Sequence, residues 1–66
     1  MLIQVNGDLR ELSDGTTVAA LLDRMELRHR RVAVEVNGEI VPRSRHRDWR
    51  LEDGDRVELV QAMGGG

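Results

Sequence analysis

The feature that most constrains this chain is its short length combined with the absence of cysteine, because 66 residues must fold without a disulfide. A domain of about 60 residues buries only about 60% of the surface that its unfolded chain exposes, so its stability is marginal. The two histidines, His29 and His46, cannot form a structural zinc site by themselves. We therefore expect one domain with a small aliphatic core. Such a core leaves little room for an enclosed active site, which favours a binding or carrier protein over an enzyme.

Five short apolar or alternating segments are typical of strands, and turn signals separate them. The predicted strands are residues 2–5, 8–12, 32–36, 39–41 and 56–61. Asn6-Gly7 and Asn37-Gly38 each lie between two of these segments. Asn-Gly in this position predicts a type I′ hairpin turn, because both central residues need a positive φ. Residues 53–55, Asp-Gly-Asp, form a third turn signal.

One segment has the spacing of an amphipathic helix. Its apolar residues recur at i, i+3, i+4 and i+7, and they are Val18, Leu21, Leu22 and Met25. Either Thr16 or Thr17 can cap the N-terminus, so we expect a helix of about eight to ten residues. The basic cluster at residues 28–31 follows at or beyond its C-terminus, and we interpret this positive charge as complementing the helix dipole.

The order of these elements predicts the fold class. Strands joined by tight turns pair antiparallel, and the helix must place its apolar face on the sheet. A right-handed crossover through the helix can then bring a later strand beside the first one in parallel. We therefore predict an α+β fold of the ubiquitin-like β-grasp type, with a mixed sheet of four or five strands and one main helix on one face. Residues 1–61 form this domain, and residues 62–66 form a flexible tail.

The tail ends in three glycines, Gly64, Gly65 and Gly66. With glycine near 7% of residues, this run occurs by chance about once in 3,000 termini. A tail without side chains can enter a narrow channel and bring its backbone close to a partner's active site. Its reactive group is the carboxylate of Gly66, which must be activated, typically by adenylation with ATP, before a sulfur nucleophile can form a thiocarboxylate. We predict that Gly66 carries the chemistry and that Gly64 and Gly65 provide access.

The residue types that are missing limit the chemistry further. Without cysteine, the chain cannot carry sulfur as a persulfide on its own side chain. All ten basic residues are arginines, so an activated tail meets no lysine amine on its own chain. The net charge of −2 argues against a general nucleic-acid-binding protein. The apolar start is too short for a signal peptide, and no apolar run approaches the roughly 20 residues that span a membrane. We expect a cytoplasmic protein.

Over essentially all 66 residues, the sequence resembles the sulfur carrier family of thiazole (thiamine) biosynthesis, ThiS. The most specific shared stretches are Asn-Gly-Glu-Ile-Val-Pro-Arg at 37–43 and Asp-Gly-Asp-Arg-Val-Glu-Leu at 53–59, together with the glycine tail. The Val-Asn-Gly start and the Asp-Gly-Thr-Thr-Val entry to the Leu-Leu helix add to this resemblance.

This resemblance implies a β-grasp carrier that is not itself an enzyme and holds no cofactor or metal. It implies that a ubiquitin-activating-like adenylyltransferase (ThiF-type) uses ATP and magnesium to adenylate Gly66. A cysteine desulfurase or other persulfide donor then supplies sulfur, and thiazole synthase (ThiG-type) receives it. The family's functional glycine pair corresponds to Gly65 and Gly66. Since the chain has no Phe or Tyr, any apolar docking patch must be aliphatic. The candidate docking residues beside the tail are Val60, Ala62 and Met63.

Three other functions are compatible with parts of the sequence. A carrier of the same fold could serve molybdopterin synthesis or tRNA thiolation, and a glycine tail also permits a ubiquitin-like protein modifier. The third alternative is a small RNA-binding module that uses Trp49 and the arginines Arg43, Arg45, Arg47 and Arg50. We interpret this last segment as a solvated loop with Trp49 at the edge of the core. The acidic residues that interrupt its positive charge are Asp48, Glu52, Asp53 and Asp55.

Overall fold

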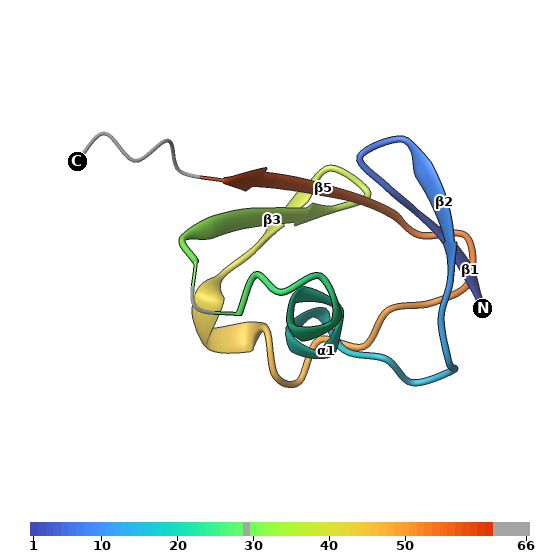
Figure 1. Cartoon of the computed structure of the whole chain (residues 1–66), viewed down its shortest axis with the longest axis horizontal. Coiled ribbons are helices and arrows are strands. Elements are labelled where there is room, and N and C mark those ends of the chain that lie inside the picture. The colour runs from blue at the N-terminus through green and yellow to red at the C-terminus, as the bar shows by residue number, and fades with distance from the viewer. Residues whose placement is uncertain (29, 62–66) are drawn as a thin grey trace.

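The computed structural model describes residues 1–28 and 30–61, which form one five-stranded sheet with a helix on one of its faces (Figure 1). The strands are β1 (Leu2–Val5), β2 (Asp8–Glu11), β3 (Val32–Val36), β4 (Glu39–Val41) and β5 (Arg56–Gln61). The helix is α1 (Val18–Arg24), and a single 3₁₀ turn, η1 (Arg43–Arg45), precedes the long loop to β5. The predicted α+β fold is thus confirmed.

The sheet is mixed, with the strand order β2-β1-β5-β3-β4. The last strand of the chain therefore lies at the centre. β5 runs parallel to β1, with Gln4 opposite Arg56, and antiparallel to β3, with Val32 opposite Gln61. The crossover through α1 makes this parallel pairing possible, as the element order predicts.

Both Asn-Gly turns have the predicted type I′ geometry. Asn6 and Gly7 have φ values of +50° and +88°, and Asn37 and Gly38 have values of +54° and +83°. Asparagine tolerates this left-handed conformation better than most residues, and glycine adopts it without a steric penalty. The two turns fix the registers of the β1–β2 and β3–β4 hairpins.

Helix α1 begins at the second of the two predicted caps. The Thr17 hydroxyl accepts a hydrogen bond of 3.1 Å from the Ala20 backbone N–H. The helix has only seven residues, slightly fewer than predicted, because Glu26 adopts a left-handed φ of +60°. The backbone N–H of Leu27 donates to the Leu22 carbonyl (2.7 Å), as in a Schellman C-cap. The chain ends its helix there without the usual glycine.

The core between α1 and the sheet is entirely aliphatic. Its buried members are Ile3, Val5, Leu12, Val18, Leu21, Leu22, Val34, Val36, Val41, Leu51, Val57 and Leu59. Trp49 is half-buried against this core, as predicted. The segment around Trp49 is tied to the start of α1, since the carbonyls of Trp49 and His46 accept hydrogen bonds from the N–H groups of Val18 (2.9 Å) and Ala19 (2.8 Å). These bonds satisfy helix donors that would otherwise lack partners.

The unusual end of α1 generates a stability prediction. Replacing Glu26 with glycine removes the steric cost of a left-handed L-residue, and this gain exceeds the entropy lost by ordering glycine. We expect Glu26→Gly to raise the free energy of unfolding by about 0.5–1 kcal/mol in urea titrations. As a control, Arg24→Gly lies in ordinary helical backbone and should lower it by about 1 kcal/mol. A less stable Glu26→Gly variant would contradict this account.

Candidate functional site

The predicted reactive tail follows directly after β5. Five of its predicted site and docking residues lie outside the described residues, namely Ala62, Met63, Gly64, Gly65 and Gly66. The structure therefore shows where the tail begins. That point is Gln61, the last residue of β5, which pairs with Val32 at the start of β3. Figure 1 shows that β5 points to the side of the molecule where β3 begins and η1 lies.

The two neighbours of β5 support different parts of it. β3 pairs with β5 from Val57 to Gln61, whereas β1 pairs with it only at Arg56 and Val57. β1 ends at Val5 and turns away into the first hairpin. The second half of β5, which leads into the tail, therefore has a backbone partner strand on one side only.

The side chain of Asn6 occupies the place where a partner strand is missing. Its Oδ1 accepts a hydrogen bond from the Leu59 N–H (2.7 Å), and its Nδ2 donates to the Leu59 carbonyl (3.1 Å). The amide thus mimics a backbone peptide group and continues the hydrogen bonding of β1 along β5. Asn6 thereby fixes the strand two residues before its end.

Asn37 also holds β5 through its side-chain amide, at the other end of the strand. Its Oδ1 accepts a hydrogen bond from the Arg56 N–H (2.9 Å), and its Nδ2 donates to the Asp55 carboxylate (2.9 Å). Sequence analysis identified both asparagines only as turn formers. The sequence did contain a signal, because asparagine precedes glycine in both hairpins. Among the common turn residues, asparagine alone carries an amide, which offers an N–H donor and a carbonyl acceptor as a peptide group does.

Val60 is the one predicted docking residue that the structure describes. It is 65% exposed and lies beside Ala33 of β3. Since Val57 and Leu59 are buried, strand alternation places Val60 on the sheet face opposite α1. Core packing therefore does not explain this valine, and it remains available to a partner beside the start of the tail.

The arginine-rich segment does not have the features of a stacking platform for RNA. The segment begins with the single 3₁₀ turn η1, and Arg45 pairs with Asp48 at 3.1 Å. Trp49, the only aromatic residue of the chain, packs against the core and does not stand free in solvent. Single-stranded nucleic acids need exposed aromatic rings on which bases stack, which argues against this alternative.

The described residues contain neither a metal-binding cluster nor a membrane-spanning helix. Across residues 1–28 and 30–61, no three His, Asp or Glu side chains lie together in a way that could hold a metal ion. No helix in these ranges has the length and apolar character needed to cross a membrane.

Comparison with known sequences identifies relatives over the whole chain. The sequence model of the ThiS family matches residues 3–66. The sulfur carrier protein ThiS of Escherichia coli is 33% identical over 66 residues, covering all of both chains. The sulfur carrier protein ThiS of Bacillus subtilis is 36% identical, covering 98% of this chain and all of the relative.

Two further similarities concern a larger protein and a solved structure. A thiazole synthase of Paramagnetospirillum magneticum is 44% identical over all of this chain, which spans only 20% of that relative's length. The crystal structure of the thiamine biosynthesis protein ThiS from Geobacter metallireducens superimposes with a TM-score of 0.84. The two chains are 33% identical, and the match covers both completely.

The two hydrogen bonds by which Asn6 holds β5 can be tested by replacing Asn6 with glycine. Asn6→Gly preserves the left-handed turn but removes both hydrogen bonds to Leu59, so we expect a loss of about 1–2 kcal/mol in the free energy of unfolding. Hydrogen exchange should also become faster at the Leu59 amide. Asn37→Gly is the matched control, and it should expose the Arg56 amide while leaving Leu59 protected. Unchanged exchange at Leu59 in Asn6→Gly would show that the side chain does not hold the strand.

Proposed function

The chain belongs to the ThiS family, and on that premise we propose that it is the sulfur carrier of thiamine biosynthesis, with the Gly66 carboxylate as its working group. The observation that carries this proposal is the continuity of the family match, which runs from residue 3 through the glycines to Gly66. The fold supports it, because β5 is held on both sides and ends at Gln61, three residues before the first of these glycines.

The proposed chemistry has three steps, namely adenylation, transfer of sulfur and reduction. A carboxylate oxygen of Gly66 attacks the α-phosphorus of ATP, and pyrophosphate leaves. The terminal sulfur of a donor protein's persulfide then attacks the acyl carbon, AMP leaves, and an acyl disulfide remains. Two further thiols reduce its S–S bond and are themselves oxidised to a disulfide, which leaves one sulfur on Gly66 as a thiocarboxylate and returns the donor as a thiol. This chain contributes the acyl group, and its partners contribute the catalysis.

The absence of cysteine and lysine suits this role. No thiol of the chain can capture the activated sulfur, and no lysine amine can attack the adenylate from within the same molecule. The glycines also suit this role, since a peptide without side chains can approach an enzyme's reacting groups closely.

We propose three protein partners for this carrier. A ThiF-type adenylyltransferase consumes ATP and magnesium, and a cysteine desulfurase or other persulfide donor supplies sulfur. A ThiG-type thiazole synthase accepts the sulfur. Support for the synthase comes from relatives named thiazole synthase that include a region 44% and 35% identical to this chain. We further propose that Val60, Ala62 and Met63 form an aliphatic contact with these partners, and that the reactions take place in the cytoplasm.

The other functions of a glycine tail differ only after activation. A carrier for molybdopterin or tRNA thiolation would form the same thiocarboxylate and deliver it elsewhere, whereas a protein modifier would form isopeptide bonds. Similarity to a thiamine biosynthesis protein and to regions of proteins named thiazole synthase favours the thiazole acceptor.

Intact mass spectrometry can detect the proposed thiocarboxylate. The chain is incubated with its activating enzyme, ATP and a persulfide donor, and then treated with a thiol alkylator. Exchanging oxygen for sulfur adds nearly the same mass as oxidising a methionine, so the alkylated adduct provides the distinguishing signal. Because the chain lacks cysteine, we expect alkylation only at the C-terminal peptide. An adenylate that never accepts sulfur would favour the modifier, and no activation at all would contradict the proposed function.

Deletion of Gly65 and Gly66 should separate the function of the tail from the stability of the fold. We expect this variant to lose sulfur transfer completely while its circular dichroism spectrum stays unchanged, because the core lies within residues 3–59. Ser44→Ala is the control, since Ser44 is exposed in η1 and should retain transfer. Transfer by the truncated chain would show that another group carries the sulfur.

A further inference from the structure

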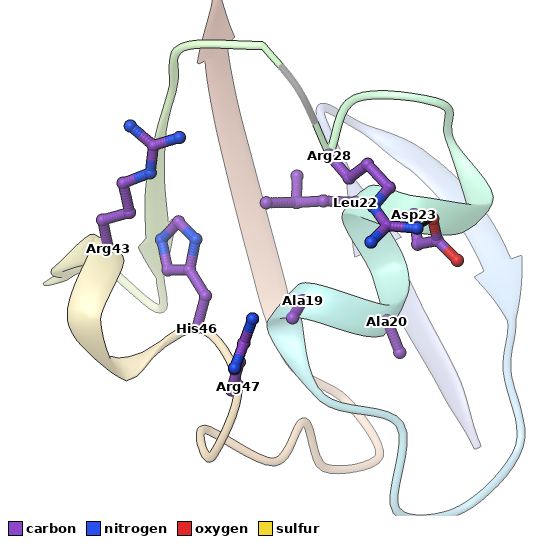
Figure 2. A pocket seen from close by; sticks show the side chains of 8 residues that line it. All are labelled: Ala19, Ala20, Leu22, Asp23, Arg28, Arg43, His46 and Arg47. Carbon is purple, nitrogen blue, oxygen red and sulfur yellow. Dashed lines mark hydrogen bonds and ion pairs between the residues drawn. The ribbon is translucent and has the colours of Figure 1, made fainter.

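Two adjoining hollows lie on the side of the molecule between α1 and η1. Their volumes are about 520 and 420 Å³, and both are lined by Leu22, Arg28, Arg43 and His46. They therefore form one continuous depression. Figure 2 shows its first part, with His46 and Arg43 on one wall, α1 on the other, and Arg47 rising between them. Five arginines line the whole depression, which we call the basic groove, and they are Arg28, Arg30, Arg31, Arg43 and Arg47.

The charge of the basic groove contrasts with that of the rest of the chain. Its five arginines and one acidic residue, Asp23, give a local charge of +4. Since the chain as a whole carries −2, all remaining residues together carry −6. Among the described residues, the one ion pair made by these arginines is the exposed contact of Arg28 with Asp23 at 3.4 Å. The groove thus presents positive charge on an otherwise acidic molecule.

The helix dipole does not explain these arginines. Only Arg24 lies in the last turn of α1, and the effect of the dipole falls off within that turn. Arg28, Arg30 and Arg31 follow after the left-handed Glu26, and Arg43 and Arg47 come from a different part of the chain. The fold brings these two sequence segments together on opposite walls of one depression.

The basic groove also extends to the beginning of the tail. Its second hollow is lined by Val32, Ala33 and Val60, which lie at the start of β3 and near the end of β5. A protein bound in the groove would therefore lie beside Gln61, where the glycine tail begins.

The shape of the groove favours an extended acidic polypeptide as its ligand. It is open and its arginines are spread along it, whereas sites for small molecules enclose most of the ligand. The buried ring of His46 is fixed in the wall of the groove, with its Nε2 bound to the Val41 carbonyl at 3.2 Å. The guanidinium groups can each form forked hydrogen bonds with carboxylates. RNA is a poorer fit, because the chain's one aromatic side chain packs against the core.

We infer that the basic groove binds an acidic segment of thiazole synthase, and this inference rests on the function proposed above. The separation of charge would attract an acidic partner to the groove and repel it from the other faces. Such complementarity raises the rate of encounter and fixes orientation more than it adds affinity. In this orientation the tail begins at the edge of the contact, next to the partner that receives its sulfur.

The test compares two double charge reversals in binding to thiazole synthase from the same organism. R43E/R47E reverses two exposed arginines of the groove, and R10E/R56E makes the same change of charge at exposed positions that line neither hollow. We expect R43E/R47E to weaken binding roughly tenfold or more at low salt, mainly through slower association, while R10E/R56E changes it little. The difference should shrink at high salt, because ions screen the attraction. Circular dichroism of each variant checks the fold.

A second titration examines the groove without the synthase. A hexaglutamate peptide is added to isotopically labelled chain, and amide NMR shifts are followed. We expect shifts around α1 and η1 that R43E/R47E abolishes. Normal synthase binding by R43E/R47E, or equal losses in both variants, would overturn the inference. Failure of the wild-type chain to bind the synthase would instead overturn the proposed acceptor. Stronger competition by RNA than by the peptide would also overturn the inference.

Discussion

The pairing of β5 at the centre of the sheet is the constraint on which the rest of the structure depends. The strand hydrogen-bonds to β1 on one side and to β3 on the other, so it joins the two hairpins into one sheet. Its inward residues, Val57 and Leu59, belong to the core beneath α1. A chain that places its last strand here cannot complete its core until that strand has docked. Folding of the domain consequently also places Gln61, the residue after which the tail begins.

Much of this architecture could be predicted from local sequence. The Asn-Gly pairs, the apolar spacing from Val18 to Met25 and the alternation in 32–36 each correspond to an observed element. The prediction of where α1 ends was less accurate, because the left-handed residue is Glu26 and not the glycine that usually marks such a position. The helix propensities of the residues do not predict this C-cap, because the packing of Leu27 against the core helps to stabilise it.

The features that sequence reasoning missed all depend on contacts between distant segments. The amide of Asn6 reaches Leu59, more than 50 residues away, and the local sequence around either residue does not predict that contact. The basic groove likewise combines arginines from before β3 and after β4. Read along the chain, Arg28 to Arg31 suggested a dipole effect and Arg43 to Arg50 a solvated loop. Only the fold shows that they border one depression.

The half-buried position of Trp49 has a practical consequence for spectroscopy. The chain contains no tyrosine or phenylalanine, so its ultraviolet emission comes from one indole. That indole lies against the core, and the carbonyl of the same residue accepts a hydrogen bond from the first residue of α1. Its fluorescence therefore reports the contact between the helix and the loop that follows η1, without any label. The wild-type molecule therefore carries its own optical probe where this loop contacts the start of α1.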